Sequence, residues 1–208
     1  GEEAHSRGTQ QLFDPVLDLG RDPRHGRVEE TYGEDPYLAS RMGIAYVRGV
    51  QSQDVICTLK HFVANFVGAG GREGANIDFS ERTLRETYFP PYEAAIRQAD
   101  ALGVMCAYNA LNGTPCAINH WLLTDVLRGE WGFQGSVVSD WSAVNHGLDQ
   151  HHAAATKAEA ARLCITAGLD VDLPRVNYYK SLIAEVNAGR LPEETLNESV
   201  RRVLRLKS

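Results

Sequence analysis

The sequence predicts an α/β fold, specifically an incomplete (β/α)8 barrel of the TIM type. Short apolar segments alternate with longer amphipathic ones, which is typical of parallel strands covered by helices. Polar or charged residues follow nearly every expected strand, among them Lys60, His61, Tyr108 and Asp140. A doubly wound sheet shows the same alternation, but in a barrel these positions ring one mouth. The 208 residues fall short of the roughly 250 of a full barrel, so we expect one partial barrel domain over residues 1–208.

Five short apolar runs predict the strands. Each is bounded by polar or Gly-containing segments, as buried parallel strands usually are. They cover residues 12–17, 55–59, 102–107, 136–139 and 169–173.

The helices begin at recognisable caps. Asp35 before Pro36 is an N-cap followed by proline at the first helical position, and Ser80 can cap the next helix. The first helix has an expected apolar face of Leu38, Met42, Ala45 and Gly49. The second has an expected face of Leu84, Tyr88, Tyr92 and Ala95, and the Pro90-Pro91 pair should kink or interrupt it.

Three more helices are expected towards the C-terminus. One covers residues 119–128, and the Thr-Lys-Ala-Glu stretch at 156–159 is a capping box that opens another. The last helix ends in basic residues, as a helix C-terminus favours. Its apolar stripe is Leu196, Val200, Val203 and Leu204.

Composition excludes several classes of protein. A net charge of −6, with 43% hydrophobic and 23% charged residues, is ordinary for a globular protein and unlike a nucleic-acid binder. No apolar run approaches a membrane span, so we expect neither nucleic acid nor a membrane as partner. The first eight residues resemble the tail of a helix, which suggests a truncated N-terminus. The compartment therefore stays open between periplasm, secretion and cytoplasm.

No cofactor or metal is expected. The chain lacks a Gly-rich nucleotide cradle, and its histidines show no metal-binding spacing. Its four cysteines match no metal-knuckle pattern and are expected to be free core residues. A Cys106–Cys116 disulfide is left open.

Asp140 is the first candidate for chemistry. It follows the expected strand at 136–139, which would hold its carboxylate rigidly, and Trp141 could wall a pocket beside it. An aromatic plane next to a carboxylate suits a sugar ring. The alternative is that Asp140 caps the following helix.

Lys60 and His61 follow another strand in the same way. Together they could grip vicinal hydroxyls of a sugar. Alternatively, Lys60 could form a Schiff base, as in an aldolase, or pair structurally with an acid.

Four further residues could reach the same mouth. Arg27 and Arg72 could bind hydroxyls or Asp140, although surface roles are the alternative. Met105 and Tyr108 flank the end of the third strand and could instead be packing residues. Asp170 and Asp172 are interpreted as structural or supporting acids.

Taken together, these segments resemble glycoside hydrolase family 3. The match runs in order through nearly the whole chain. It rests on Pro-Val-Leu-Asp at 15–18, Arg-Asp-Pro-Arg-His-Gly-Arg at 21–27, Glu-Thr-Tyr-Gly-Glu-Asp-Pro at 30–36, Lys-His-Phe at 60–62, Ser-Glu-Arg-Thr-Leu-Arg-Glu at 80–86, Val-Met-Cys-Ala-Tyr-Asn at 104–109, Glu-Trp-Gly-Phe at 130–133 and Val-Val-Ser-Asp-Trp at 137–141.

The resemblance implies a role for each matched position. Asp140 would be the nucleophile of a retaining, double-displacement hydrolysis of terminal non-reducing β-D-glucosyl residues. The implied substrates are β-linked oligosaccharides or aryl and alkyl glycosides. The implied sugar ligands are Arg27, Lys60, His61, Arg72 and Tyr108, and the implied pocket walls are Met105 and Trp141.

The sequence departs from the family pattern in three places. His25 stands where the family usually shows Trp. The early barrel strand with a sugar-binding aspartate is absent, so the N-terminal portion of the barrel is the expected missing part. The C-terminal α/β domain that usually supplies the acid/base glutamate is also absent, so we expect the chain alone to be weakly active or inactive.

The functional alternatives stay open at this point. Asp140-Trp141 favours a β-glucosidase over a β-xylosidase, because many xylosidases carry Cys after the nucleophile. The Lys-His-Phe-Val-Ala-Asn-Phe loop at 60–66 does not fit the N-acetylhexosaminidase branch. A Schiff-base lyase through Lys60 and a sugar-binding fragment without turnover are the alternatives from other classes.

Overall fold

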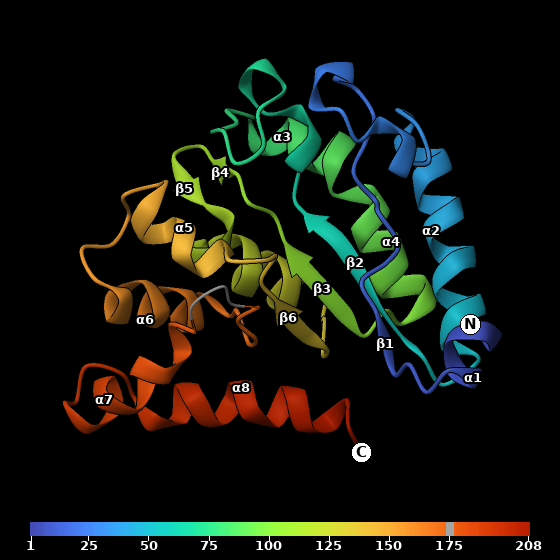
Figure 1. Cartoon of the computed structure of the whole chain (residues 1–208). Helices are drawn as coiled ribbons and strands as arrows, with labels where there is room; N and C mark the ends of the chain where they lie inside the picture. The colour runs from blue at the N-terminus through green and yellow to red at the C-terminus, as the bar shows by residue number, and fades with distance from the viewer. Residues whose placement is uncertain (174–176) are drawn as a thin grey trace.

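A computed structural model describes residues 1–173 and 177–208. Its centre is a parallel sheet with strand order β1-β2-β3-β6 (Figure 1). The strands are β1 (Gln11–Leu12), β2 (Ile56–Phe62), β3 (Gly103–Cys106) and β6 (Ser136–Val138). The predicted α/β class and parallel sheet are confirmed, and the sheet formed by the described residues is open rather than closed.

Helices connect successive strands and cover the outer face of the sheet. In the chain, α2 (Pro36–Gln51) precedes β2 and α4 (Pro90–Ala99) follows it. The two helices pack side by side (Figure 1). The π-helix η7 (Trp121–Glu130) leads into β6. The remaining α-helices are α1 (Glu2–Ser6), α3 (Glu81–Thr83), α5 (Ala143–Asp149), α6 (Lys157–Ala167), α7 (Leu182–Asn187) and α8 (Glu193–Arg205).

Short single-turn helices occupy the loops. They are η1 (Pro23–His25), η2 (Val28–Glu30), η3 (Asn65–Val67), η4 (Ala69–Gly71), η6 (Cys116–Ile118) and η8 (Tyr179–Ser181). Helix α3 lies at the carboxyl end of the sheet, which is the upper end in Figure 1.

The predicted helix caps are confirmed. The side chain of Asp35 accepts a hydrogen bond from the backbone N–H of Tyr37 at 2.8 Å. Ser80 and Thr156 likewise accept from the N–H three residues ahead, at 3.1 Å in each case. These side chains satisfy donors that the first helical turn leaves unpaired, which explains why the helices begin there.

The proline pair interrupts its helix as predicted. The π-helix η5 (Leu84–Tyr88) ends at Tyr88, and α4 begins at Pro90. Because Pro90 has no N–H to donate to the preceding turn, the hydrogen-bond ladder breaks there.

The predicted core face of α2 is wrong. Leu38 and Met42 are 47% and 44% exposed. A second stripe at the same spacing is buried instead, and it contains small residues that let the helix approach the strand segment closely. A Cβ at Gly43 would lie 2.8 Å from the Leu17 side chain. The buried set is Ala39, Ser40, Gly43, Ile44, Val47 and Val50.

Two predicted strands are shorter than expected. In the first, predicted at 12–17, the regular strand β1 ends at Leu12. Beyond it a single bridge joins Val16 to Lys60, because Pro15 has no N–H to donate to a ladder. The segment 169–173 makes one bridge, from Val171 to Val138. The N–H groups of Asp170 and Val171 both donate to the same carbonyl, that of Val137, so the regular ladder does not continue.

A β-hairpin was not predicted. Strands β4 (Ala110–Leu111) and β5 (Thr114–Pro115) pair antiparallel around Asn112 and Gly113. Both turn residues have positive φ, at 50° and 83°. This is the conformation that an Asn-Gly turn favours.

The core lies between the sheet and its outer helices. Phe62 of β2 is fully buried, and its ring contacts the rings of Phe89, Tyr92 and Trp131 at centroid distances of 5.2–6.1 Å. All four cysteines are buried and free, which confirms the expectation of core thiols over a disulfide.

The inner face of the sheet is left open. It borders a cavity of about 540 Å³ that α8 also lines. Its lining includes Phe13, Ile56, Ser136, Val138, Val203 and Leu206. No helix within residues 1–173 and 177–208 is both long enough and apolar enough to cross a membrane.

Candidate active site

Asp140 lies directly beyond the end of β6, as the sequence predicts. Its side chain is 14% exposed, so the carboxylate reaches the surface of the mouth while most of it is enclosed. Oδ1 accepts the backbone N–H of Trp141 at 2.6 Å. Oδ2 has no hydrogen-bond partner among the residues described. The carboxylate bonds to no backbone N–H of α5, which argues against a role as its cap.

The segment that carries Asp140 is tied to its neighbour in the sheet. The N–H of Ser139 donates to the carbonyl of Val171 at 2.8 Å. In return, the hydroxyl of Ser139 accepts the N–H of Leu173 at 2.8 Å. These two bonds fix the backbone immediately before Asp140.

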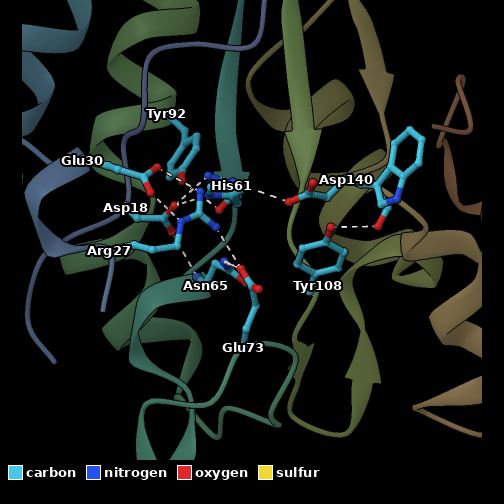
Figure 2. Close-up of polar contacts among 10 residues, drawn as sticks. Asp18, Arg27, Glu30, His61, Asn65, Glu73, Tyr92, Tyr108 and Asp140 are labelled. Atoms are coloured by element: carbon cyan, nitrogen blue, oxygen red, sulfur yellow. Dashed lines mark hydrogen bonds and ion pairs between the residues drawn. The ribbon is translucent and has the colours of Figure 1, made fainter. Parts of the chain in front are cut away.

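His61 connects Asp140 to a second, buried aspartate. Its Nε2 lies 3.5 Å from Oδ2 of Asp140, and its Nδ1 lies 2.7 Å from Oδ2 of Asp18 (Figure 2). The hydroxyl of Tyr92, on α4, donates to the His61 carbonyl at 2.8 Å. Both the Lys60–His61 and the Phe62–Val63 peptide bonds are cis.

Tyr108 extends from the end of β3 to the far side of Asp140. Its hydroxyl donates to the carbonyl oxygen of Trp141 at 2.7 Å (Figure 2). Burial, and then the nearby Asp140 carboxylate, raise the pKa of the Tyr108 phenol. The phenol is therefore a neutral donor at any physiological pH.

Trp141 borders an open cavity of about 380 Å³, whose lining residues do not include Asp140. The indole is 60% exposed, so it walls the pocket on one side only. The other residues lining this cavity are Glu73, Gly74, Tyr108, Ser142, His146 and Gln150.

Arg27 faces two glutamates rather than Asp140. Its guanidinium donates to both carboxylate oxygens of Glu30, at 2.6 and 2.9 Å, and to Glu73 at 2.9 Å (Figure 2). It also stacks over the Phe66 ring at 5.2 Å. The hydrogen bond from Arg27 lowers the pKa of Glu30.

The remaining predicted site residues differ in their burial and in their contacts. Met105 is buried on β3, opposite Val138 of β6, and Lys60 is half-buried at the end of β2, where its charge also lowers the pKa of Glu30. Arg72 is exposed, and within the described chain no contact joins it to the cluster.

His25 occupies the rim where the resemblance leads us to expect Trp. Its ring stacks on Phe66 with centroids 4.1 Å apart. Both ring nitrogens are buried without a hydrogen-bond partner in the described part of the chain, and this burial lowers the pKa of the imidazole.

Two site residues escaped the sequence reasoning. Asp18 belongs to the Pro-Val-Leu-Asp segment at 15–18 but is not among the predicted site residues, and neither is Glu73. The position of Asp18 after a strand was the available signal, because it resembles that of Asp140. Glu73 lies in an irregular loop, and nothing in its local sequence indicates where the side chain points.

Asp170 is a structural anchor. Its fully buried carboxylate accepts from Arg128 at 2.7 Å, from Arg202 of α8 at 2.8 Å and from the N–H of Val137 at 2.8 Å. The predicted structural interpretation therefore fits the geometry. No group of three or more side chains in the described residues is placed to hold a metal ion.

Comparison with known proteins identifies the family. Residues 1–206 match the model of the glycosyl hydrolase family 3 N-terminal domain. The chain belongs to this family. Its N-terminal domain is of the TIM-barrel type, so the open parallel sheet is part of such a barrel.

The chain is similar to relatives named as β-glucosidases and to relatives named as β-xylosidases. A β-glucosidase of Rhizobium radiobacter is 43% identical over 208 residues, which cover 99% of this chain and 24% of the relative. A β-xylosidase of Formosa agariphila is 46% identical over 180 residues, covering 82% and 25%. The chain thus spans about a quarter of the length of these curated relatives.

Solved structures agree with this assignment. A β-glucosidase from Erythrobacter marinus superposes with a TM-score of 0.96 at 36% identity, over 99% of this chain and 28% of the other. The Listeria innocua β-glucosidase in complex with gluconolactone gives a TM-score of 0.94 at 40% identity, over 99% and 29%.

Proposed function

We propose that residues 1–208 supply part of the barrel catalytic domain of a retaining β-glucosidase. Asp140 is the nucleophile, and the enzyme releases terminal non-reducing β-D-glucosyl residues. One observation carries the proposal most directly. Oδ2 of Asp140 is a buried carboxylate oxygen that accepts no hydrogen bond from the described residues, so no contact of the described chain occupies its lone pairs.

The reaction proceeds by two displacements. Oδ2 of Asp140 attacks the anomeric carbon and forms a covalent glycosyl-enzyme, while a carboxylic acid protonates the departing oxygen. That acid then acts as a base and removes a proton from the water that cleaves the ester. We place the acid/base residue outside these 208 residues, in a C-terminal α/β domain, because the chain covers only part of its relatives.

The neighbours of Asp140 hold the sugar in this proposal. Lys60, His61 and Tyr108 bind hydroxyls, while Met105 and Trp141 form walls. Arg27 binds a hydroxyl with a guanidinium that Glu30 and Glu73 already orient. Arg72, which is exposed, joins only if its loop bends towards the mouth when sugar binds.

A β-xylosidase is the second candidate. The relatives from Formosa agariphila named as a β-xylosidase and a putative β-xylosidase favour it, at 46% and 38% identity. The rates with aryl glucoside and aryl xyloside, measured on the intact enzyme, decide between the two. The natural substrates are β-linked oligosaccharides or aryl and alkyl glycosides in either case.

The Schiff-base alternative loses support from the environment of Lys60. A Schiff-base lysine is usually desolvated, whereas Lys60 is only half-buried in β2. The carboxylate of Glu30 is close enough for the charge of Lys60 to lower its pKa.

Covalent trapping tests the proposal. The intact protein is incubated with a dinitrophenyl 2-deoxy-2-fluoro-β-glucoside, whose leaving group needs little acid assistance. Intact mass and peptide mapping should find one sugar on Asp140, and Asp140→Asn should abolish labelling. A folded protein that stays unlabelled, or that is labelled at another residue, would contradict the assignment. Binding without labelling would favour a sugar-binding role.

A further inference from the structure

Both carboxylate oxygens of Asp18 make contacts within the protein. Its carboxylate is fully buried. Oδ2 accepts the backbone N–H of His61 at 2.8 Å and lies 2.7 Å from the imidazole Nδ1. Oδ1 accepts the N–H of Asn65 at 3.1 Å. One side chain thus fixes the main chain and the ring of His61 together.

From this geometry we infer that Asp18 is a positioning residue: it places the proton of His61 on Nδ1 and aims Nε2 at Asp140. The inference extends the proposed function, since its kinetic part assumes that Asp140 reacts.

The donor and acceptor roles follow from the bonding pattern. Both oxygens of Asp18 already accept backbone N–H groups, so the oxygen facing the ring also acts as an acceptor. The ring must then supply the proton from Nδ1. The other ring nitrogen, Nε2, then faces Asp140, whose Oδ2 lies 3.5 Å away. A partner that fixes one nitrogen of a histidine sets what the other can do.

The ring is also fixed against rotation. Tyr92 holds the His61 carbonyl from α4, and Phe66 packs beside the imidazole with centroids 5.8 Å apart. Asp18 contacts its Nδ1 edge, and the imidazole is only 2% exposed. The orientation of Nε2 is therefore set before any sugar arrives.

The substitution Asp18→Asn reverses the polarity of the contact at almost unchanged volume. An amide nitrogen facing Nδ1 would donate to it, so the ring would carry its proton on Nε2 instead. We expect the rate constant for labelling of Asp140 by the fluoroglucoside to fall about 10- to 100-fold or more, because misdirected groups cost this much. The inhibitor's dissociation constant should change far less.

The decisive readout is the protonation of His61 nitrogens. Histidine-selective ¹⁵N labelling of the intact protein gives the histidine signals, and the signals lost in His61→Gln belong to His61. In the unsubstituted protein Nδ1 should be of the protonated type, and in Asp18→Asn of the unprotonated type. Asp14→Asn is the matched control, because Asp14 lies in the same segment and receives the Tyr46 hydroxyl. It should leave both the His61 signals and the labelling rate unchanged.

The outcomes separate the two proposals. An unprotonated Nδ1 in the unsubstituted protein overturns the positioning role, even if Asp18→Asn does not fold. An Asp18→Asn protein with unchanged signals and an unchanged labelling rate overturns it as well. If Asp140 is never labelled but Nδ1 responds as expected, the placement of the His61 proton stands and the proposed function fails.

Discussion

The hydroxyl of Tyr108 donates to the carbonyl oxygen of Trp141 at 2.7 Å, so the end of β3 is tied to the residue that follows Asp140. The carbonyl of Tyr108 in turn contacts Nε2 of His151 at 2.8 Å. Tyr108 therefore links the third strand to both ends of the loop and helix that follow Asp140.

Removal of this hydroxyl should loosen the Asp140 segment. For Tyr108→Phe we expect a loss of about 1 kcal/mol in the free energy of unfolding, the usual contribution of such a hydrogen bond. Labelling of Asp140 should slow as the carboxylate becomes less well held. Urea denaturation and the labelling rate measure the two effects. Tyr37→Phe, at a residue 72% exposed, serves as control, and equal behaviour of the two variants would argue against the role of Tyr108.

Two adjacent arginines of α8 should differ in their contribution to stability. Arg202 donates to the buried carboxylate of Asp170 at 2.8 Å, whereas Arg201 pairs with exposed glutamates. We expect Arg202→Met to lower the free energy of unfolding by about 1.5–3 kcal/mol, as for hydrogen bonds to a charged group. Arg201→Met should leave the denaturation midpoint unchanged, since exposed ion pairs contribute little. The expectation fails if the two midpoints shift alike.

The cysteines should be inert until the protein unfolds. All four are buried, and burial raises the pKa of Cys57 and of Cys116 to about 12. Because the thiolate is the reactive form, a thiol reagent at pH 8 should label none of them in the native protein. In denaturant without reductant, peptide mapping of residues 1–208 should find all four labelled. A count of two would reveal a disulfide instead.

The Arg27–Glu30 pair should make stability depend on acid pH. The hydrogen bond from Arg27 holds the pKa of Glu30 below its usual 4.5. The stabilisation that this pair gives to the folded state is therefore fully present above about pH 4.5. It is lost as the pH falls through the lowered pKa of Glu30. The melting temperature of Glu30→Gln should lie below that of the unsubstituted protein at neutral pH, and the gap should close on acidification. Glu29→Gln, at an exposed neighbour, should show no gap, and a gap for Glu30→Gln that widens in acid would reverse the sign we expect.

Local signals in the sequence were sufficient for the helix starts and for Asp140. Capping bonds join residues two or three apart, so Asp35, Ser80 and Thr156 could be interpreted without knowledge of the fold. The position of Asp140 just beyond β6 could be predicted because the end of a buried strand is visible as the end of an apolar run.

The features that were missed depend on contacts distant in sequence. Two stripes of α2 have helical spacing, and only the approach of Leu17 to Gly43 decides which one is buried. Glu73 is defined by its bond to Arg27, which lies 46 residues away. The hairpin is different. The Asn-Gly pair at 112–113 is a sufficient local signal for a hairpin, although none was predicted there.

The residues around Asp140 come from separate loops, each attached to its own strand. Asp18 follows the first strand segment, Glu73 lies in the loop after β2, and Tyr108 follows β3 (Figure 2). Evolution can therefore exchange one loop at a time without rebuilding the others. A transplanted loop after β2 would alter the Glu73 side of the cavity while the bonds from Ser139 to the neighbouring segment still hold Asp140. This separation lets one scaffold carry different cavity linings around the same aspartate.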